Sequence, residues 1–372
     1  MTNEQNVKIG IVSVDVNTPM FNYGAILHTW AFEKFLRKNG FTNVETLDYY
    51  PESIEYQNRR FPFVDLLTDC HRKLSLYYIR HYREYLKKYK VVQKFISKEM
   101  TLSKKKYRYS TISREKLPYD ILIAEDDVIW SPRFLCRTEL VDKTFFLAHP
   151  NMTCRKIAYA PSMAQCNYRE DEYAVIKKYL EDFEAISVRE KYEKKFIEAN
   201  LGINVEQCLD AVFLLEADEY QPIISNRFKG RSYILLYLPA DDNKTLRVAA
   251  QKKAKELNLE IIEISNRICS SPNVYGDAGV EDFLSGVFYA KYIFTNSFHA
   301  ICFSIIFQKQ FFVFSRANAG KLKDICELFS LEKHYHTDEN CFINKIDYSC
   351  VDVIRSNLSN KARKWLLSAL RG

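Results

Sequence analysis

Residues 292–307 read YIFTNSFHAICFSIIF, and they consist of two apolar runs separated by a short polar break. The first run has the length of a buried strand, and the second has the length of a helix that begins after the break. Ser297 is a suitable N-cap for this helix, and His299 stands in its first turn beside unpaired backbone N–H groups. A helix N-terminus with an imidazole suits a phosphate or carboxylate ligand, or proton transfer near neutral pH. The alternative is a histidine that caps a buried turn.

The same alternation of short apolar runs and helical patterns continues on both sides of this stretch. The strands that it predicts are residues 8–14, 44–50, 120–124, 156–160, 185–188, 233–238, 259–264, 292–295 and 311–314. The helices that it predicts are residues 25–36, 71–99, 189–202, 243–257, 280–289, 300–307, 320–329 and 360–371. Two successive β-α-β series indicate an α/β protein with two doubly wound, Rossmann-like sheets, whose ligands bind beyond the carboxyl ends of the strands.

The length of 372 residues is too great for one ordinary core and suits two domains. The best boundary signal is Pro222 together with the polar stretch 225–232. We therefore predict an N-terminal domain over 1–222, a C-terminal domain over 223–345 and a helical segment over 346–372.

Composition favours an ordinary globular protein, with 47% hydrophobic and 27% charged residues. No apolar run reaches the roughly 18–20 residues that a membrane-spanning helix needs. The N-terminus lacks the basic and apolar regions of a signal peptide. The ten cysteines show neither a CxxC pair nor metal-ligand spacing. These features predict a cytoplasmic protein with reduced thiols and no metal site.

Positive charge is concentrated in residues 71–116, which hold fifteen Lys and Arg against three acids, in a chain of net charge +7. Such asymmetry suggests an anionic partner, which could be a phosphorylated substrate, a membrane surface or a nucleic acid. Nucleic acid is the least favoured, because the aromatic residues follow the spacing of a helix core rather than forming a stacking platform. The alternative to all three is a solvated helix face.

Two further strand-to-helix loops contain candidate binding residues. Asn22, Tyr23 and Gly24 precede the first helix, so the backbone N–H of Gly24 can meet an anion or a sugar hydroxyl; a tight turn with a capping Asn is the alternative. Arg189 follows the strand 185–188 and can hold a carboxylate or phosphate with two parallel hydrogen bonds. The alternative for Arg189 is a surface ion pair with the neighbouring glutamate.

Three adjacent acids, Glu125, Asp126 and Asp127, follow the strand 120–124. They could be bases, metal ligands or helix caps, and the sequence does not choose among these roles. Their position at a strand end nevertheless places them at the edge of the first sheet where ligands bind.

Five motifs in this order resemble those of the polysaccharide pyruvyl transferase family. They are FNYGAILHTWAF (21–32), YDILIAEDDVIWSP (119–132), AISVREK (185–191), CLDAVFLL (208–215) and TNSFHAICFSIIF (295–307). The resemblance spans residues 8 to about 330. It implies a fold similar to GT-B glycosyltransferases, with a cleft between the two domains.

The resemblance also implies a reaction. Members of the family transfer the enolpyruvyl unit of phosphoenolpyruvate onto a sugar as a ketal and release phosphate, with no obligatory cofactor. Catalytic roles then fall to His299, Arg189 and Asp127. The donor would be bound by Arg189, Ser297, His299 and Asn296, and the acceptor by Asn22, Tyr23, Gly24 and Asp126. Arg189 would hold the donor carboxylate or phosphate, and His299 would be a phosphate ligand or general acid.

Several positions depart from the family pattern. The family's Gly-Ser-Asp is here Glu125-Asp126-Asp127, its Asp before Ser-Phe-His is Asn296, the following Gly is Ala300, the Pro after Leu-Asp is Ala211, and a Gln of the first helix is His28. Asn296 cannot act as a base. Ala300, in place of glycine, narrows the space through which a ligand approaches the N-terminus of the helix.

The favoured interpretation is a cytoplasmic, phosphoenolpyruvate-dependent pyruvyl transferase that acts on a glycan, capsule or exopolysaccharide precursor. If the acceptor is carried on polyprenyl diphosphate, segment 71–116 would contact anionic lipid at the inner face of the membrane. Two alternatives remain. One is a nucleotide-sugar glycosyltransferase of the same fold, and the other is a degenerate binding protein, which Asn296 and the Glu125 loop favour.

Overall fold

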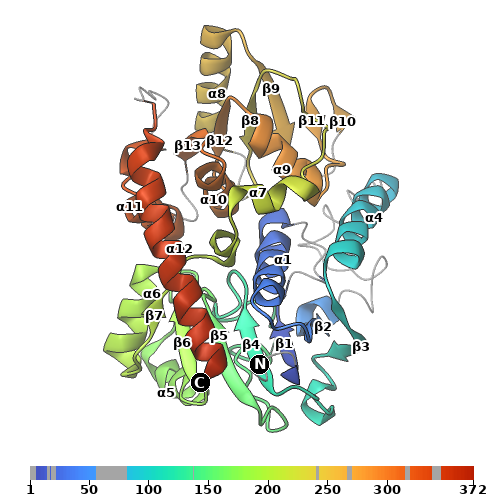
Figure 1. Ribbon diagram of the computed structural model, residues 1–372, viewed down its shortest axis with the longest axis vertical. Helices are drawn as coiled ribbons and strands as arrows, with labels where there is room; N and C mark the ends of the chain where they lie inside the picture. Colours follow the sequence, from blue (N-terminus) through green and yellow to red (C-terminus); the bar gives the residue numbers. More distant parts are fainter. Residues whose placement is uncertain are drawn as a thin grey trace. The chain divides into compact units, whose positions relative to one another are not determined.

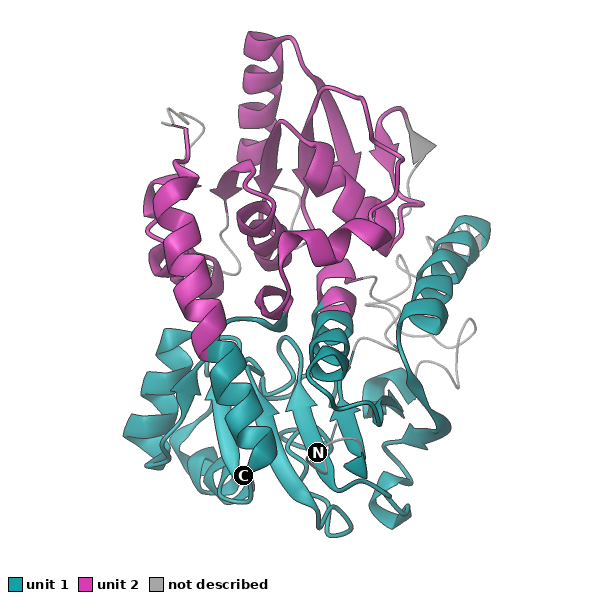
Figure 2. Cartoon of the chain, viewed as in Figure 1, with its two compact units in different colours: residues 1–21, 28–211, 362–372 teal, residues 22–27, 212–361 magenta. Residues whose placement is uncertain are grey.

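The computed structural model describes residues 6–14, 17, 22–55, 82–136, 138–239, 243–265, 270–314, 319–336 and 345–372 (Figure 1). The chain forms two compact units, coloured teal and magenta in Figure 2. Unit 1 comprises residues 1–21, 28–211 and 362–372, and unit 2 comprises residues 22–27 and 212–361. Each unit has its own parallel sheet with helices, so the prediction of two Rossmann-like sheets is confirmed.

The sheet of unit 1 has seven strands in the order β3-β2-β1-β4-β5-β6-β7, and every neighbouring pair is parallel. The strands are β1 (Ile9–Val12), β2 (Val44–Tyr50), β3 (Leu102–Arg108), β4 (Ile121–Glu125), β5 (Arg155–Tyr159), β6 (Ala185–Val188) and β7 (Glu206–Gln207). Strands β1 and β4 are buried along their whole length, as expected of apolar strands covered on both faces.

The sheet of unit 2 has the order β10-β11-β9-β8-β12-β13-β14. Its strands are β8 (Tyr233–Tyr237), β9 (Glu260–Ile264), β10 (Ser270–Ser271), β11 (Val274–Tyr275), β12 (Tyr292–Thr295), β13 (Gln310–Phe314) and β14 (Tyr335–His336). All pairs are parallel except the short β10–β11 pair. In both sheets the order reverses once, between β1 and β4 in unit 1 and between β8 and β12 in unit 2. Ligands of doubly wound sheets bind beside such reversals.

Helices follow the strands in both units. In chain order they are α1 (Tyr23–Lys38), α4 (Tyr82–Glu99), α5 (Tyr173–Leu180), α6 (Lys191–Phe196), α7 (Ala217–Tyr220), α8 (Lys244–Leu257), α9 (Val280–Tyr289), α10 (Phe298–Ile306), α11 (Ala319–Leu328) and α12 (Tyr348–Arg371). All nine residues of α10 are buried, which explains why the run AICFSIIF is apolar on every side. No helix in the described parts of the chain is both long and apolar enough to cross a bilayer.

The chain divides at residue 211 rather than at the predicted residue 222. The segment after residue 211 packs into unit 2, where Phe213 stacks on Phe329 and the Tyr220 ring meets Phe303 edge-on. Pro222 therefore lies in a short helical turn of unit 2 and does not mark a boundary. The predicted C-terminal segment 346–372 is likewise divided between the units, at residue 361.

One other prediction falls partly outside the described residues, and two need correction. The helix predicted over 71–99 is described only from Tyr82, and its first part lies outside the described residues. The final helix begins at Tyr348 rather than at residue 360. The pattern analysis missed α5 and also β3, whose sequence LSKKKYR has three exposed lysines in its middle and no apolar run.

We predict that Trp130→Ala destabilises unit 1 by about 3–5 kcal/mol, because a large buried side chain is lost. Trp130 is fully buried, its ring stacks on Phe146 with the ring centroids 5.2 Å apart, and its Nε1 donates to the Phe145 carbonyl at 2.9 Å. Urea unfolding followed by circular dichroism measures the loss. The control Trp130→Phe keeps the ring packing and should cost clearly less. Equal costs for the two variants would contradict this explanation.

Candidate active site

The polar break in the sequence forms the turn between β12 and α10 of unit 2. Thr295 donates from Oγ1 to the Tyr237 carbonyl at the end of β8, at 2.6 Å, and accepts a hydrogen bond from the Ser297 N–H at 3.0 Å. The Ser297 hydroxyl accepts from the Ala300 N–H at 3.3 Å, so the predicted N-cap is confirmed. Asn296 is buried in the same turn. The two hydroxyls thus fix the backbone that leads into α10.

His299 lies in the first turn of α10 and is only 3% exposed. The residue that limits the space around the His299 side chain is Gly24, which belongs to the segment 22–27 of unit 2. A Cβ added at Gly24 would lie 2.1 Å from Cγ and 2.3 Å from Cβ of His299. Only glycine at position 24 therefore leaves room for His299. The motif around Gly24 and the motif around His299, which are far apart in the sequence, thus depend on each other.

Tyr23 anchors the same segment in unit 2. Its ring is fully buried and stacks on Phe283 and Tyr237, with centroid separations of 5.7 and 6.3 Å. Its hydroxyl donates to the Ala278 carbonyl at 2.6 Å. Burial, with Tyr237 as the next cause, raises the pKa of Tyr23 well above its ordinary value. The Tyr23 side chain is thus part of the packing of unit 2.

Residues 22–24 were predicted to bind the acceptor as part of the N-terminal domain. The structure assigns them to unit 2, and Asn22 accepts the first helical hydrogen bond of α1, from the Ile26 N–H at 3.2 Å. Their part in acceptor binding stays a prediction. The sequence of residues 22–24 gives no signal that they pack in unit 2, because their packing partners, such as Phe283, lie far along the chain.

In unit 1, charged residues gather beyond the carboxyl ends of β4, β6 and β7. The buried acids are Glu125, Asp126, Asp127, Glu190, Glu193 and Asp210, and the buried bases among them are His28 and Arg189. Strand ends and the helices that follow them bring these side chains together, as the parallel sheet predicts. Buried charges on this scale must be paired or neutralised.

Arg189 binds three carboxylates. Its Nη2 lies 2.6 Å from Asp127 Oδ1, its Nε lies 2.7 Å from Glu190 Oε1, and its Nη1 lies 3.1 Å from Asp210 Oδ2. The pair with Glu190 was the alternative offered by the sequence, although it is buried rather than at the surface. The predicted role of Arg189 as a donor ligand stays a prediction. In this arrangement the guanidinium orients the acids around it.

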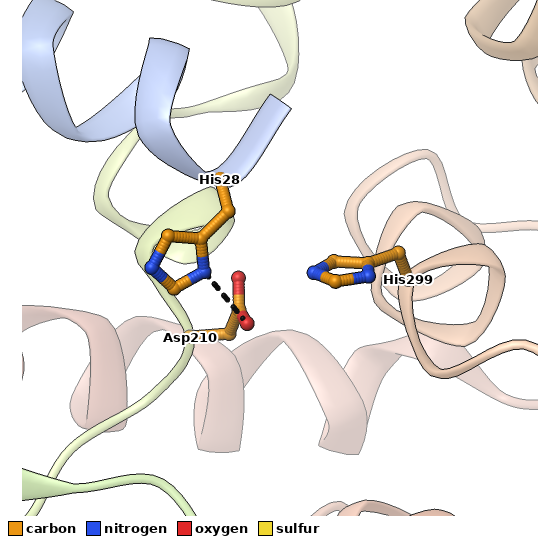
Figure 3. A group of neighbouring side chains, drawn as sticks. All are labelled: His28, Asp210 and His299. Carbon is orange, nitrogen blue, oxygen red and sulfur yellow. Dashed lines mark ion pairs between the residues drawn. The ribbon is translucent and has the colours of Figure 1, made fainter. Parts of the chain in front are cut away.

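His28 of α1 bridges two further carboxylates. Its Nδ1 lies 3.0 Å from Asp210 Oδ2, the ion pair drawn in Figure 3, and its Nε2 lies 2.7 Å from Glu125 Oε2. Burial by itself lowers the pKa of His28, but Asp210 and Glu125 together raise it well above the ordinary value. A protonated imidazole, with an N–H on each nitrogen, fits this position between two carboxylates. Two departures from the family pattern, His28 and Glu125, are thus partners in one ion pair.

Asp126 joins the β4 loop to the end of β1. Its Oδ2 accepts from the Ser13 hydroxyl at 2.7 Å and from the Val14 N–H at 3.0 Å, and its Oδ1 accepts from the Asp127 N–H at 2.6 Å. Its φ of 139° is a conformation that residues with side chains rarely adopt. These hydrogen bonds hold that backbone in place, and the predicted acceptor-binding role of Asp126 remains untested.

Glu193 of α6 is a further buried acid at the edge of this cluster. It accepts from the Ser162 hydroxyl at 2.9 Å and the Met163 N–H at 2.6 Å. Burial, followed by the charge of Glu190, raises the pKa of Glu193 well above its usual range. A proton on this carboxyl reduces the negative charge that Arg189 and His28 must balance.

We predict that Gly24→Ala destabilises unit 2 by about 3 kcal/mol, the upper end of the cost of overpacking, because the new methyl overlaps His299. Thermal unfolding measures the loss. The matched background is His299→Gly, which removes the three histidine atoms that the methyl would meet. Gly24→Ala should cost much less in that background, and an equal cost in both would exclude the contact as the cause.

We predict that the stability gap between the wild type and His28→Gln depends on pH. Because the folded-state pKa of His28 is raised above the unfolded value of about 6.5, its contribution is complete below pH 6.5 and is lost as pH rises through the folded pKa. Breaking such buried pairs costs about 3–5 kcal/mol. Melting temperatures between pH 6 and pH 10 should show the gap narrowing on the alkaline side.

The control for this experiment is His149→Gln. Burial lowers the pKa of His149 to about 4, below the unfolded value of about 6.5, so its protonation affects stability only near and below about pH 6.5 and its stability gap should be flat from about pH 7.5 to pH 10. A gap for His28→Gln that is equally flat would show that His28 is not charged in the folded protein.

Comparison with known proteins agrees with the motifs. The family model for polysaccharide pyruvyl transferase matches residues 22–318. No curated protein matches the chain. Similar solved structures include a putative UDP-N-acetylglucosamine 2-epimerase from Listeria monocytogenes, 9% identical over 96% of this chain and 90% of that one, with a TM-score of 0.46. Another is UDP-N-acetylglucosamine 2-epimerase from Rickettsia bellii, 11% identical over 97% and 96%, with a TM-score of 0.40. Because the family model covers most of its length, the chain belongs to the polysaccharide pyruvyl transferase family.

Proposed function

We propose that this chain transfers the enolpyruvyl unit of phosphoenolpyruvate onto two hydroxyls of a glycan precursor, forming a ketal and releasing phosphate. Family membership supports pyruvyl transfer in general. The observation that carries the proposal is His299, held in the first turn of α10 by the Ser297 cap and given its space by Gly24. An imidazole in the first turn of a helix, at the positive end of the helix dipole, suits a dianionic phosphate.

The proposed reaction requires two additions at one carbon. Protonation of the donor's methylene carbon makes its C2 electrophilic, and the first sugar hydroxyl adds there and loses its proton. The second hydroxyl then replaces phosphate at C2. Two new C–O bonds have then formed at C2, and the bond between C2 and the phosphate oxygen has broken. One hydroxyl proton balances the proton taken up by the methylene carbon, and the other leaves with phosphate. We assign His299 as phosphate ligand and general acid, with Asn296 and Ser297 beside it.

Asp127 is the best candidate base in unit 1. Its side chain is 12% exposed, whereas those of Glu125 and Asp210 are fully buried. Arg189 contacts Asp127 at 2.6 Å and orients it, which favours a positioning role for the arginine over direct donor binding. The acceptor in this proposal is a glycan.

The test is incubation with phosphoenolpyruvate and a panel of galactosyl, mannosyl and N-acetylhexosaminyl acceptors, with phosphate release and acceptor mass both measured. The wild type should add a ketal mass to at least one acceptor. His299→Ala should abolish the product, and Asp127→Asn should lower kcat by about 100-fold, the typical size of a general-base contribution. Asp171→Asn, an exposed acid of unit 1, is the matched control and should leave turnover unchanged.

Two outcomes would replace this proposal. If phosphoenolpyruvate raises the melting temperature and no acceptor reacts, the chain is a binding protein. The ion pair between His28 and Glu125 is compatible with that outcome. If UDP- or GDP-sugars stabilise the protein and phosphoenolpyruvate does not, it is a glycosyltransferase that uses nucleotide sugars.

A further inference from the structure

The exposed face of α4 is a continuous stripe of positive charge. Five cations follow one another at intervals of three or four residues and are all exposed: Arg83, Lys87, Lys90, Lys94 and Lys98. Side chains at these intervals share one face of a helix. At 1.5 Å per residue the stripe is about 22 Å long, which exceeds the size of a single phosphate or small anionic substrate.

Strand β3 extends this charge along the edge of the sheet of unit 1. Lys104, Lys105, Lys106 and Arg108 are exposed on it. The two elements follow one another directly in the chain, since α4 ends at Glu99 and β3 begins at Leu102. The helix and the strand are therefore neighbours, and we call their exposed cations together the α4–β3 basic surface.

Most of the charge on the helix is not neutralised. Among the described residues, no acid forms an ion pair with Arg83, Lys87, Lys90 or Lys94, whereas Lys98 pairs with Glu99 at 2.7 Å. Glu84 is the one exposed acid on this helix. Like charges on neighbouring turns repel one another by a few tenths of a kcal/mol per pair, so the stripe is kept at a cost to the helix.

Exposed apolar side chains border the stripe. In the described parts of the chain five large apolar residues are exposed, and two of them, Tyr89 (41%) and Val91 (39%), belong to α4. By the helix period Val91 lies beside the row of lysines, and Tyr89 lies further round the helix, between the row and the buried face. Lysines flanked by tyrosine and a small apolar residue are typical of surfaces that meet the headgroup layer of a bilayer.

We propose that the α4–β3 basic surface binds an anionic lipid bilayer. Anionic headgroups supply the extended sheet of negative charge that the stripe fits, and each Lys or Arg near such a surface adds to its attraction. A nucleic acid would take the cations equally well, but it offers the valine no apolar contact, and binding a single strand needs stacking aromatics. This inference does not rest on the proposed reaction.

The contact is electrostatic and does not insert the helix. The apolar side of α4 is already buried in unit 1 through Val92, Phe95 and Ile96, which are at most 3% exposed. The helix therefore has no apolar face left to enter the acyl chains, and salt should release the protein because surface charges are screened within about 10 Å at 0.1 M salt.

The experiment is co-sedimentation of the full chain with vesicles at 50 mM and 500 mM NaCl. Vesicles of phosphatidylcholine alone are compared with vesicles that contain one third phosphatidylglycerol. The wild type should bind the anionic vesicles at low salt, dissociate at high salt and ignore the neutral vesicles. The variant Lys87→Glu/Lys90→Glu/Lys94→Glu should bind at least about 100-fold more weakly.

The matched control is Lys244→Glu/Lys252→Glu/Lys255→Glu, which makes the same charge change on exposed residues of α8 in unit 2. It should keep most of the wild-type binding, and both variants should keep the wild-type circular dichroism spectrum. The proposal fails if the wild type does not bind anionic vesicles, or if the two variants lose binding equally. Tighter binding to RNA or DNA than to anionic vesicles at the same salt would also overturn it.

Discussion

The pairing of buried charge at the carboxyl ends of β4, β6 and β7 is the constraint on which unit 1 depends. Arg189 and His28 both contact Asp210, so the two cations and their carboxylates form one connected system. Removing one member of a buried pair leaves its partner uncompensated, at a cost of about 3–5 kcal/mol. The loops that follow three strands, and the first helix, are therefore fixed by one set of interactions. The same arrangement leaves Asp127 as the most exposed of the three carboxylates that contact Arg189, with 12% of its side chain exposed.

The sequence predicted most of the strands in the centre of each sheet, because their apolar runs are unambiguous; β2, β6 and β12 have the predicted bounds. It failed at β3, since a strand at the edge of a sheet needs no apolar run. The N-cap Ser297 could be predicted because capping is local. The ion pair of His28 with Glu125 could not, since each residue alone has several plausible roles and only the folded sheet brings them together.

The Asn-Tyr-Gly segment shows a second limit of reading a motif locally. Glycine before a helix suggests a ligand that approaches the backbone, and here the group that approaches Gly24 is the protein's own His299. The Tyr23 hydroxyl likewise donates its hydrogen bond to the Ala278 carbonyl of the protein itself. The motif thus helps to position His299 in the candidate site, which is a different role from contacting a substrate.

The lysines of β3 have a consequence that concerns the protein in a crowded solution. β3 ends the order of strands in the sheet of unit 1, and the outer edge of such a strand can pair with a strand from another molecule. Three successive charged side chains, Lys104 to Lys106, make a second copy of this edge repel the first. The charge that suits a bilayer would therefore also protect the chain from edge-to-edge aggregation, and neutralising it would expose a template for intermolecular β-sheet.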